Sequence, residues 1–403
     1  MSLSASLSGV VPEAVSPFSA DDVLRAGRRV PGVLRERAQA GDEACCLSGE
    51  TVAIFRENGF FQVLQPRGFG GLELPAITLF RLQGLLAEAD MSAGWVMANM
   101  GVVSFHLALF PPQAQADVWG TDPDTILSSS NMPGGRLCAG PGSDFSLSGR
   151  WRFSSGVQHA DWLVLGALME RDGEPRAGAC LVPRDDVEIV ADWDVIGLRG
   201  TGSHAVEVTE VHVPAHRFLA HEDRFHGRTP GTQVNTGPLY RLPLPQLLFR
   251  SISTSSLGGL RGMLDAFLAA NGERTSMMAQ RIAEDPHVRD LCATVDADLA
   301  AMWRVLEGDL AEMSAAAERG EESSLARRRV FRLNATRVAD RCFHHGANLL
   351  RAAGAAALYR GSPLLRYFND MLAARQHAAN QYELHARNDG AALFGLGEED
   401  MLL

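Results

Sequence analysis

The chain has 403 residues, of which 46% are hydrophobic and 21% charged, and its formal net charge at pH 7 is -11. This length predicts two or three subdomains, while the negative charge argues against nucleic acid and against an anionic membrane as partners. All 37 basic residues are arginine, which excludes a lysine Schiff base and the lysine of a P-loop.

From about residue 20 to about residue 120, apolar residues recur at helical spacing. The runs Thr78–Asp90 and Ala93–Phe110 are apolar enough to predict buried helices, and Pro111 and Pro112 open another helix because proline suits a first turn. No run has the apolar length of a membrane-spanning helix, and the first residues lack the pattern of a signal peptide. Since the six cysteines show no CxxC spacing, we expect reduced thiols and a cytoplasmic protein.

From about 125 to about 220, short segments rich in Val, Leu, Trp and Phe alternate with Gly, Pro and Asp turns, which predicts a small β-barrel or sandwich. From about 245 onward, four long amphipathic segments with short links predict an antiparallel four-helix bundle. We therefore expect an α+β fold with an N-terminal helical domain (1–122), a central β-domain (123–222) and a C-terminal four-helix bundle (223–403). No GxGxxG follows a strand, so the Rossmann dinucleotide fingerprint is missing.

The segment GRWRFSSGVQHADW (149–162) places two serines, Ser154 and Ser155, between two expected aromatic-rich strands. Turns use serine in this way, so the pattern alone favours a turn serine bonded to its own backbone. A strand that presents a hydroxyl to a ligand is the alternative. The segment GLRGTGS (197–203), which contains Gly202, is either a tight connection or a loop whose backbone N–H groups face oxygen ligands.

Together with the helix–sheet–helix order, the motifs GRWRFSSGVQHADW, DWDVIGLRGTGS (Asp192–Ser203) and VHVPAHR (Val211–Arg217) resemble one branch of the acyl-CoA dehydrogenase fold. That branch is the group D flavin-dependent monooxygenases, the oxygenase components of two-component hydroxylases, and the resemblance covers most of the chain. It implies an enzyme that receives reduced FMN or FAD (FMNH2 or FADH2) from a separate flavin reductase and uses O2 through a C4a-hydroperoxide. It further implies a homotetramer and a small aromatic substrate, phenolic or polyketide-like.

Other functions stay open beside this one. The same chemistry can hydroxylate the nitrogen of an amino sugar or amine, and a relative can lose catalysis and serve as a binding partner. An acyl-CoA dehydrogenase is less favoured, because the carboxylate base that many such enzymes carry eight residues after the position of Asp370 is replaced by Ala378. The first bundle segment, Arg250–Gly262, offers no carboxylate instead.

The resemblance also implies catalytic residues. His377 would bond to the activated oxygen or orient the substrate, since an imidazole that titrates near neutrality can give or accept a proton. His106 and Ser130 match the places where relatives activate a phenolic hydroxyl. A core histidine is the alternative for His106, and Ser128 and Ser129 compete with Ser130 for its place.

For the flavin, the resemblance implies that Ser155 bonds to N5 and that Ser154 is a second candidate flavin contact, although Ser154 points to the other face if the strand is regular. Trp95 matches a tryptophan typical of the branch, although a buried helix also explains a large core residue. Arg250 and Arg261 open the bundle, where relatives place an arginine near the flavin phosphate, often across a subunit boundary; surface salt bridges are the alternative. We expect no metal site, since adjacent histidines do not share a helix face.

Overall fold

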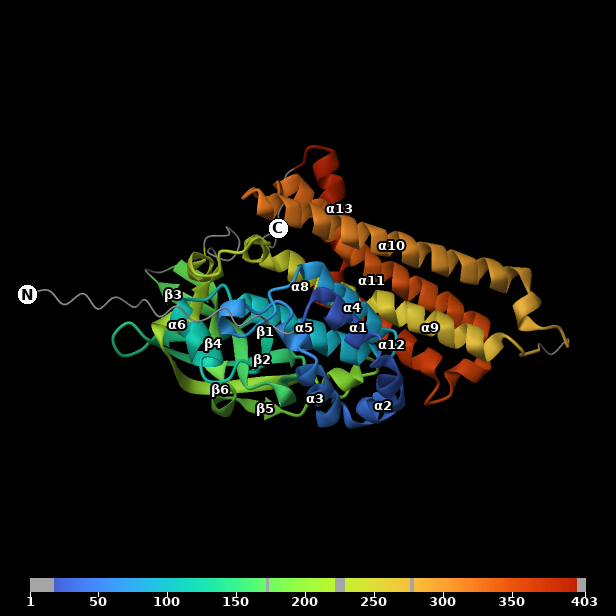
Figure 1. Cartoon of the computed structure of the whole chain (residues 1–403), viewed down its shortest axis with the longest axis horizontal. Helices are drawn as coiled ribbons and strands as arrows, with labels where there is room; N and C mark the ends of the chain where they lie inside the picture. Colours follow the sequence, from blue (N-terminus) through green and yellow to red (C-terminus); the bar gives the residue numbers. More distant parts are fainter. Residues whose placement is uncertain (1–17, 172–173, 222–228, 276–278, 397–403) are drawn as a thin grey trace, which may run out of the picture.

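The computed structural model describes residues 18–171, 174–221, 229–275 and 279–396 (Figure 1). Its first part is helical, and the two buried helices expected there are α4 and α5. The helices of this part are α1 (Ala20–Gly27), α2 (Pro31–Ala44), α3 (Gly49–Glu57), α4 (Ala76–Ala87), α5 (Met91–Leu107) and α6 (Pro112–Trp119). Asp90 begins α5 by accepting a hydrogen bond from the Ser92 N–H. Gly94 lets α4 approach, because a Cβ there would lie 2.8 Å from the Cβ of Ala87.

The central part is one seven-stranded sheet with the strand order β5-β6-β2-β1-β3-β4-β7. Its strands are β1 (Leu127–Ala139), β2 (Phe145–Ser154), β3 (Trp162–Arg171), β4 (Glu174–Pro183), β5 (Glu188–Val190), β6 (His204–Val213) and β7 (Phe218–Ala220). The β1–β3 pair is parallel and the other pairs are antiparallel. The sheet curls, since Val182 of β4 and Val206 of β6 share one hydrophobic cluster with Trp151 although three strands separate β4 from β6. The expected small β-domain is confirmed.

The last part contains the helical bundle. Its helices are α8 (Leu244–Ser253), α9 (Ser255–Asn271), α10 (Pro286–Glu318), α11 (Leu325–Ala353), α12 (Pro363–Gln376) and α13 (Tyr382–Leu393). Helix α11 contacts α9, α10 and α12, and α9 contacts α10 and α12, so these four helices form the expected bundle. None of the helices in the described ranges combines the length and apolar character needed to span a membrane.

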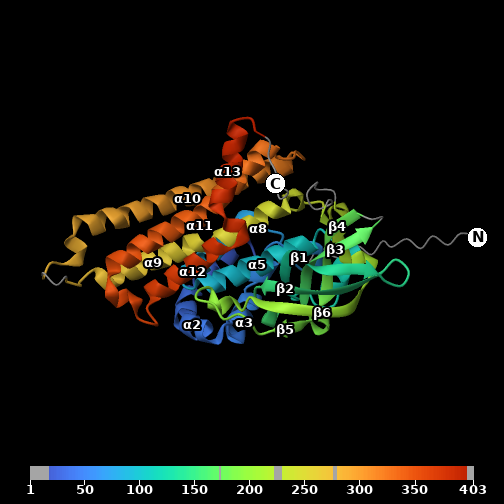
Figure 2. The ribbon, with the colours of Figure 1, turned by 180° about the vertical axis from the view of Figure 1, so that it is seen from behind.

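The fourth bundle segment is broken where the sequence predicts one long helix. Helix α12 ends at Gln376, His377 has extended backbone (φ -62°, ψ 136°), and α13 leaves in another direction (Figure 2). The buried Asn380 explains the break, because its Nδ2 donates to the carbonyl of Ala374 at 2.8 Å. A side chain thus satisfies a carbonyl at the helix end, where no further helical turn can.

One hydrophobic cluster joins the three parts of the chain. It includes Phe105 of α5, Val164 of β3 and Met371 of α12. The predicted domain boundary at 122/123 therefore divides secondary-structure types and not separate cores, and it stays a prediction. The boundary at 222/223 lies outside the described residues.

Candidate functional site

Three residues that lie far apart in the sequence meet beside α5. Ser155 follows β2 directly, and the Nε1–H of Trp95 on α5 donates to its Oγ at 3.0 Å. The Trp95 indole meets the His377 ring edge-on, with ring centroids 5.8 Å apart. Ser155 and His377 are both half-buried, whereas Trp95 is buried. The end of β2, the helix α5 and the break after α12 thus form one polar site.

His377 presents a fixed hydrogen-bond donor. The N–H of Ala379 donates to its Nδ1 at 3.1 Å, so Nδ1 carries no proton and Nε2 does. Burial, with a smaller contribution from the Arg332 cation, lowers the pKa of His377 to about 4. The ring is therefore neutral at pH 7, which corrects the expectation that it titrates near neutrality. In the part of the chain that the structure describes, no residue bonds to Nε2.

The GLRGTGS segment supplies hydroxyls to the same site. Ser203 Oγ lies 2.7 Å from Ser155 Oγ and 2.7 Å from Thr201 Oγ1. Gly202 has φ of 52°, and a Cβ there would lie 2.2 Å from Oε1 of Gln158, so its conformation and packing require glycine. Gly202 therefore fits the tight-connection interpretation, while its neighbours Thr201 and Ser203 carry the polar groups.

A buried carboxyl group anchors this segment to the bundle. The N–H of Leu198 donates to Oδ1 of Asp370 on α12 at 2.6 Å, and Asp370 is only 2% exposed. Burial raises the pKa of Asp370 to about 8. In the sequence, Asp370 serves only to locate Ala378. A buried aspartate contacting a loop 172 residues away leaves no local signal that could have revealed the contact.

Ser154 has a structural role. It is fully buried, and its Oγ lies 3.0 Å from Oγ of Ser128. Ser128 Oγ also donates to the Ser155 carbonyl at 2.8 Å. Both hydroxyls link β1 to the end of β2, on the side away from Trp95. The assignment of Ser154 as a flavin contact is therefore corrected.

Ser130 also points away from α5. Its Oγ donates to the carbonyl of Arg152 at 2.8 Å, and its neighbour on β3 is Leu165, which lies inside the curled sheet. The neighbour of Ser129 is Val164, which belongs to the cluster shared with the helices. Because side chains alternate along a strand, Ser129 replaces Ser130 as the β1 serine on the α5 face.

His106 lies on the same face of α5 as Trp95, three helical turns or ~16 Å further along. It is fully buried, and its ring centroid lies 5.5 Å from that of Phe110. The structure thus places it in the interior, three turns along α5 from Trp95 and not in direct contact with it. Its burial is compatible with a core histidine and with a residue that lines a closed substrate site, so the catalytic assignment stays a prediction.

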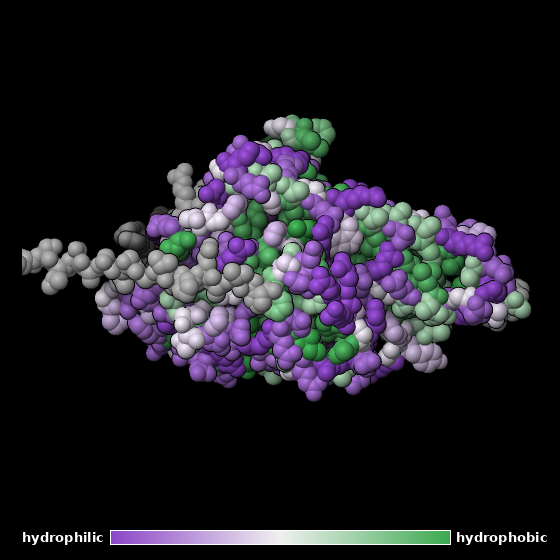
Figure 3. All heavy atoms as spheres, in the orientation of Figure 1, coloured by the Kyte–Doolittle hydropathy of each residue, from purple (hydrophilic) through white to green (hydrophobic). Residues whose placement is uncertain are grey.

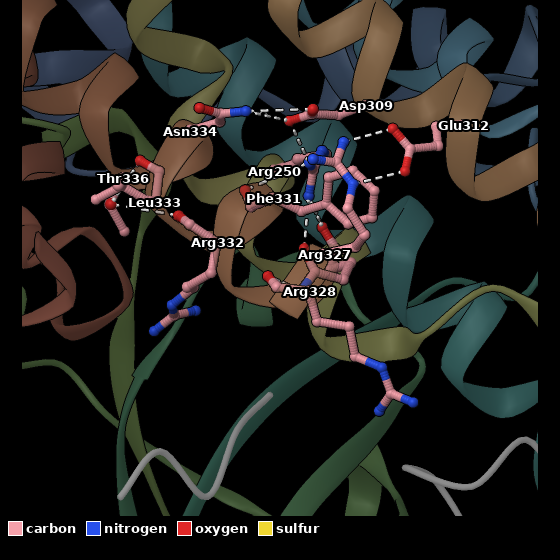
Figure 4. A network of polar contacts seen from close by, with 11 residues as sticks. Arg250, Asp309, Glu312, Arg327, Arg328, Phe331, Arg332, Leu333, Asn334 and Thr336 are labelled. Carbon is pink, nitrogen blue, oxygen red and sulfur yellow. Dashed lines mark hydrogen bonds and ion pairs between the residues drawn. The ribbon is translucent and has the colours of Figure 1, made fainter. Parts of the chain in front are cut away.

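Arg250 is enclosed in the bundle. It has no exposed surface, its NH2 donates to Asp309 at 3.1 Å, and its NH1 donates to Gln246 at 2.9 Å. Figure 4 shows this network between α8, α10 and α11. Burial lowers the pKa of Arg250 to about 10, so it stays charged at pH 7. An arginine held in this way stabilises the bundle and cannot reach a ligand phosphate, which corrects that assignment.

Arg261 lies on α9, partly exposed, and pairs with Asp265 and Asp296. It makes no contact with the polar site in this chain, and its predicted contact with a flavin phosphate stays a prediction. Within the described residues, no three His, Cys, Asp or Glu side chains are grouped as in a metal site.

The polar site fits a flavin. Ser155 and the Nε2–H of His377 offer hydrogen bonds to the polar edge of a flat ring, and Trp95 offers an apolar surface beside them. Phe153, two residues before Ser155, is 60% exposed although its φ is 66°, and its ring lies 6.0 Å from that of Trp193. An exposed aromatic residue held in the left-handed region is unfavourable by itself and is typical of ligand sites.

Comparisons with known proteins identify the family of the chain. The family described as acyl-CoA dehydrogenase, C-terminal domain, matches residues 251–382. The oxygenase subunit HsaA of a flavin-dependent monooxygenase from Rhodococcus jostii (strain RHA1) is 36% identical over 373 residues, which cover 92% of this chain and 97% of the relative. The oxygenase component of the FADH2-dependent resorcinol hydroxylase from Rhizobium sp. (strain MTP-10005) is 29% identical over 398 residues, which cover 95% of this chain and 97% of the relative. The crystal structure of the HsaA monooxygenase from M. tuberculosis matches with a TM-score of 0.91 and 35% identity, over 96% of this chain and 100% of that chain.

The fold and the site define a flavin-dependent enzyme of the acyl-CoA dehydrogenase fold. The chain belongs to the oxygenase components of the two-component flavin-dependent monooxygenases. The family resemblance, the enzyme class and the use of reduced flavin are thereby confirmed. An oxygenase component also implies a separate component that reduces the flavin.

Proposed function

We propose that this oxygenase component hydroxylates a small aromatic substrate, phenolic or polyketide-like, with reduced flavin bound against Ser155, Trp95 and His377. The meeting of these three residues at one half-buried site is the observation that carries the proposal. The resorcinol hydroxylase named above acts on a phenol, which favours hydroxylation of carbon over the alternative at nitrogen. FAD and FMN are both candidates for the cofactor.

Each residue of the site has one task in this proposal. Reduced flavin, when bound, would supply the two electrons that activate O2, so that one oxygen atom enters the substrate and the other leaves as water. Ser155 accepts a hydrogen bond from flavin N5. His377 donates its Nε2–H to the transferred oxygen or to the substrate, because Ala379 holds the other ring nitrogen. Trp95 contacts both side chains and keeps them in place. The Ala379 N–H occupies the Nδ1 lone pair and the lowered pKa disfavours protonation of the ring, so His377 acts as a hydrogen-bond donor and not as a base.

The substrate lies along α5 in this proposal, on the face that carries Trp95 and His106. Ser129 lies on the same side of the sheet, next to Val164. A histidine and a serine on this side can hold a phenolic hydroxyl and favour its deprotonation, which makes the ring carbon beside it more electron-rich.

Assembly as a homotetramer in the cytoplasm completes the proposal. Figure 3 shows apolar patches where the bundle helices reach the surface. Exposed apolar side chains next to the bundle include Leu358 (61%) and Tyr359 (75%) between α11 and α12, and Leu393 (83%) and Phe394 (86%) at the end of α13. Apolar surface of this kind is typical of contacts between subunits. All six cysteines are free thiols, which suits a reducing compartment.

The test mixes the protein anaerobically with reduced FAD or FMN and resorcinol, adds O2, and measures hydroxylated product and hydrogen peroxide. We expect the wild type to form hydroxylated product and Ser129→Ala to form less of it, by roughly tenfold or more. Ser130→Ala is the matched control; it should keep the product yield and lose about 1–3 kcal/mol of unfolding free energy, because the Arg152 carbonyl loses its donor. The proposal would be contradicted if the wild type released only hydrogen peroxide with resorcinol and with a panel of other phenols.

A further inference from the structure

A continuous run of hydrogen bonds leads from α5 to the GLRGTGS segment. Trp95 Nε1 lies 3.0 Å from Ser155 Oγ, and Ser155 Oγ lies 2.7 Å from Ser203 Oγ. Ser203 Oγ lies 2.7 Å from Thr201 Oγ1, which lies 2.7 Å from the carbonyl of Leu198. We call these groups the hydroxyl chain.

The direction of every bond in the hydroxyl chain is fixed by its two ends. An indole N–H can only donate and a carbonyl can only accept, while each hydroxyl between them has a single proton. The protons must therefore all point from Trp95 toward Leu198. Trp193 Nε1 also donates to the Leu198 carbonyl, at 3.0 Å, so both lone pairs of that oxygen are used. Asp370 holds the N–H of Leu198 and thereby helps to keep the end of the chain in place.

Ser155 is left with one open hydrogen-bonding position, and it is an acceptor. Its proton points to Ser203, and one of its lone pairs accepts from Trp95. No described residue uses the second lone pair, and the side chain is half-buried and so open to a ligand. Whatever meets Ser155 at this position must donate a proton.

The two redox states of a flavin differ in this respect at N5. Reduced flavin carries a hydrogen on N5 and can donate it to Ser155, whereas oxidised flavin presents only a lone pair there. We infer that the hydroxyl chain makes the site select reduced over oxidised flavin, with Thr201 and Ser203 as positioning residues that fix the proton of Ser155. The inference rests on the proposed contact between Ser155 and flavin N5.

The test compares the Kd values of oxidised and anaerobically reduced FAD, with FMN in parallel, for the wild type and for Thr201→Val. Valine keeps the shape of threonine but offers Ser203 no acceptor. Ser203 can then donate to Ser155, which can in turn donate to N5 of oxidised flavin. We expect tighter binding of the oxidised form, and a fall of about tenfold in the ratio of the oxidised to the reduced Kd. The reduction potential of the bound flavin should fall by about 30 mV for each tenfold.

Three further variants complete the design. Ser203→Ala should act like Thr201→Val, because it also frees the proton of Ser155, and it serves if the first variant folds poorly. Thr201→Ser rebuilds the hydroxyl chain and should keep the wild-type ratio. Ser128→Ala removes a buried hydroxyl that donates to the Ser155 carbonyl but lies outside the hydroxyl chain, so it should also leave the ratio unchanged.

The inference is overturned if Thr201→Val and Ser203→Ala leave the ratio unchanged, or if they weaken both redox states by the same factor, as loss of packing would. Ser155→Ala separates this failure from failure of the proposed function. If Ser155→Ala changes flavin affinity while the other two variants do not shift the ratio, only the inference fails. If Ser155→Ala binds both redox states like the wild type, Ser155 does not contact flavin N5 and the proposed site is wrong as well.

Discussion

The ring of His377 shows how one backbone contact determines the chemistry of a side chain. Histidine in a catalytic site invites the interpretation of a base near neutral pH. Here the Ala379 N–H fixes the tautomer, and burial lowers the pKa to about 4. The ring stays neutral in the folded protein down to about pH 4. The stability that depends on the neutral ring is fully present above about pH 6.5 and is lost as the pH falls through 4.

We therefore expect the yield of hydroxylated product per flavin oxidised to stay constant from about pH 8 to about pH 5, and to fall as the pH approaches 4. His377→Ala should release more hydrogen peroxide and lower product formation by about tenfold or more, because a fixed donor is lost. Product and peroxide are measured across the pH range. His344→Ala, at an exposed position of α11, is the control. A transition near pH 6.5 that disappears in His377→Ala would show that the ring does titrate near neutrality.

Among the elements, the GLRGTGS segment depends on helix α12 for its conformation. Leu198 has a left-handed φ of 53°, and its N–H is held by Asp370. Burial raises the pKa of Asp370, with smaller contributions from Asp90 and Asp42, while the hydrogen bond from the Leu198 N–H and the Arg366 cation oppose the shift. The carboxyl group thus stabilises the fold most when it is protonated. That stability is fully present below about pH 4 and is lost as the pH rises through 8.

Asp370→Asn keeps an oxygen for the Leu198 N–H and removes the titration. We expect the variant to lose less stability between pH 5 and pH 8 than the wild type, and to be more stable at pH 8 by on the order of 1–3 kcal/mol. Urea unfolding at each pH gives the free energies. Burial raises the pKa of Asp90 to about 6, so Asp90 also makes the unfolding free energy fall as the pH rises, and it does so equally in both proteins. Equal slopes for the two proteins would contradict the role given to Asp370.

The sequence predicts the elements better than the places where they end. Continuous apolar runs of helical length identify α4 and α5, because both helices are buried on most sides. The break at His377 leaves no such signal, since it depends on the contact of Asn380 with Ala374 and on packing around it. The choice between Ser129 and Ser130 likewise depends on strand register, because a shift of one residue moves each side chain to the other face of the sheet. Family motifs brought Ser155 and His377 to attention, but only the structure shows Trp95 between them.

For the molecule as a whole, the network around Arg250 stabilises the bundle that carries the site. Arg250→Ala leaves Asp309 buried without its partner and should cost about 3–5 kcal/mol of unfolding free energy. The double variant Arg250→Met/Asp309→Leu should recover most of that loss. Because Arg250 does not reach the polar site, the folded double variant should bind reduced flavin like the wild type.

Chemical unfolding and flavin titration of the two variants check this expectation. Arg261→Ala is the matched control for stability, since an exposed ion pair contributes about 0–1 kcal/mol. A double variant that is stable but binds flavin much more weakly would indicate that Arg250 does contact the flavin phosphate.

The hydrophobic cluster shared by the helices and the sheet has a consequence for how this enzyme loses activity on heating. With Phe105, Val164 and Met371 in one core, we expect the three parts of the chain to melt together. Calorimetry should show one cooperative transition, and bound flavin should be released at the same temperature. Excised fragments, including the isolated bundle, are then not expected to fold stably. A substitution that stabilises any part of this core should also raise the temperature at which the flavin site is lost.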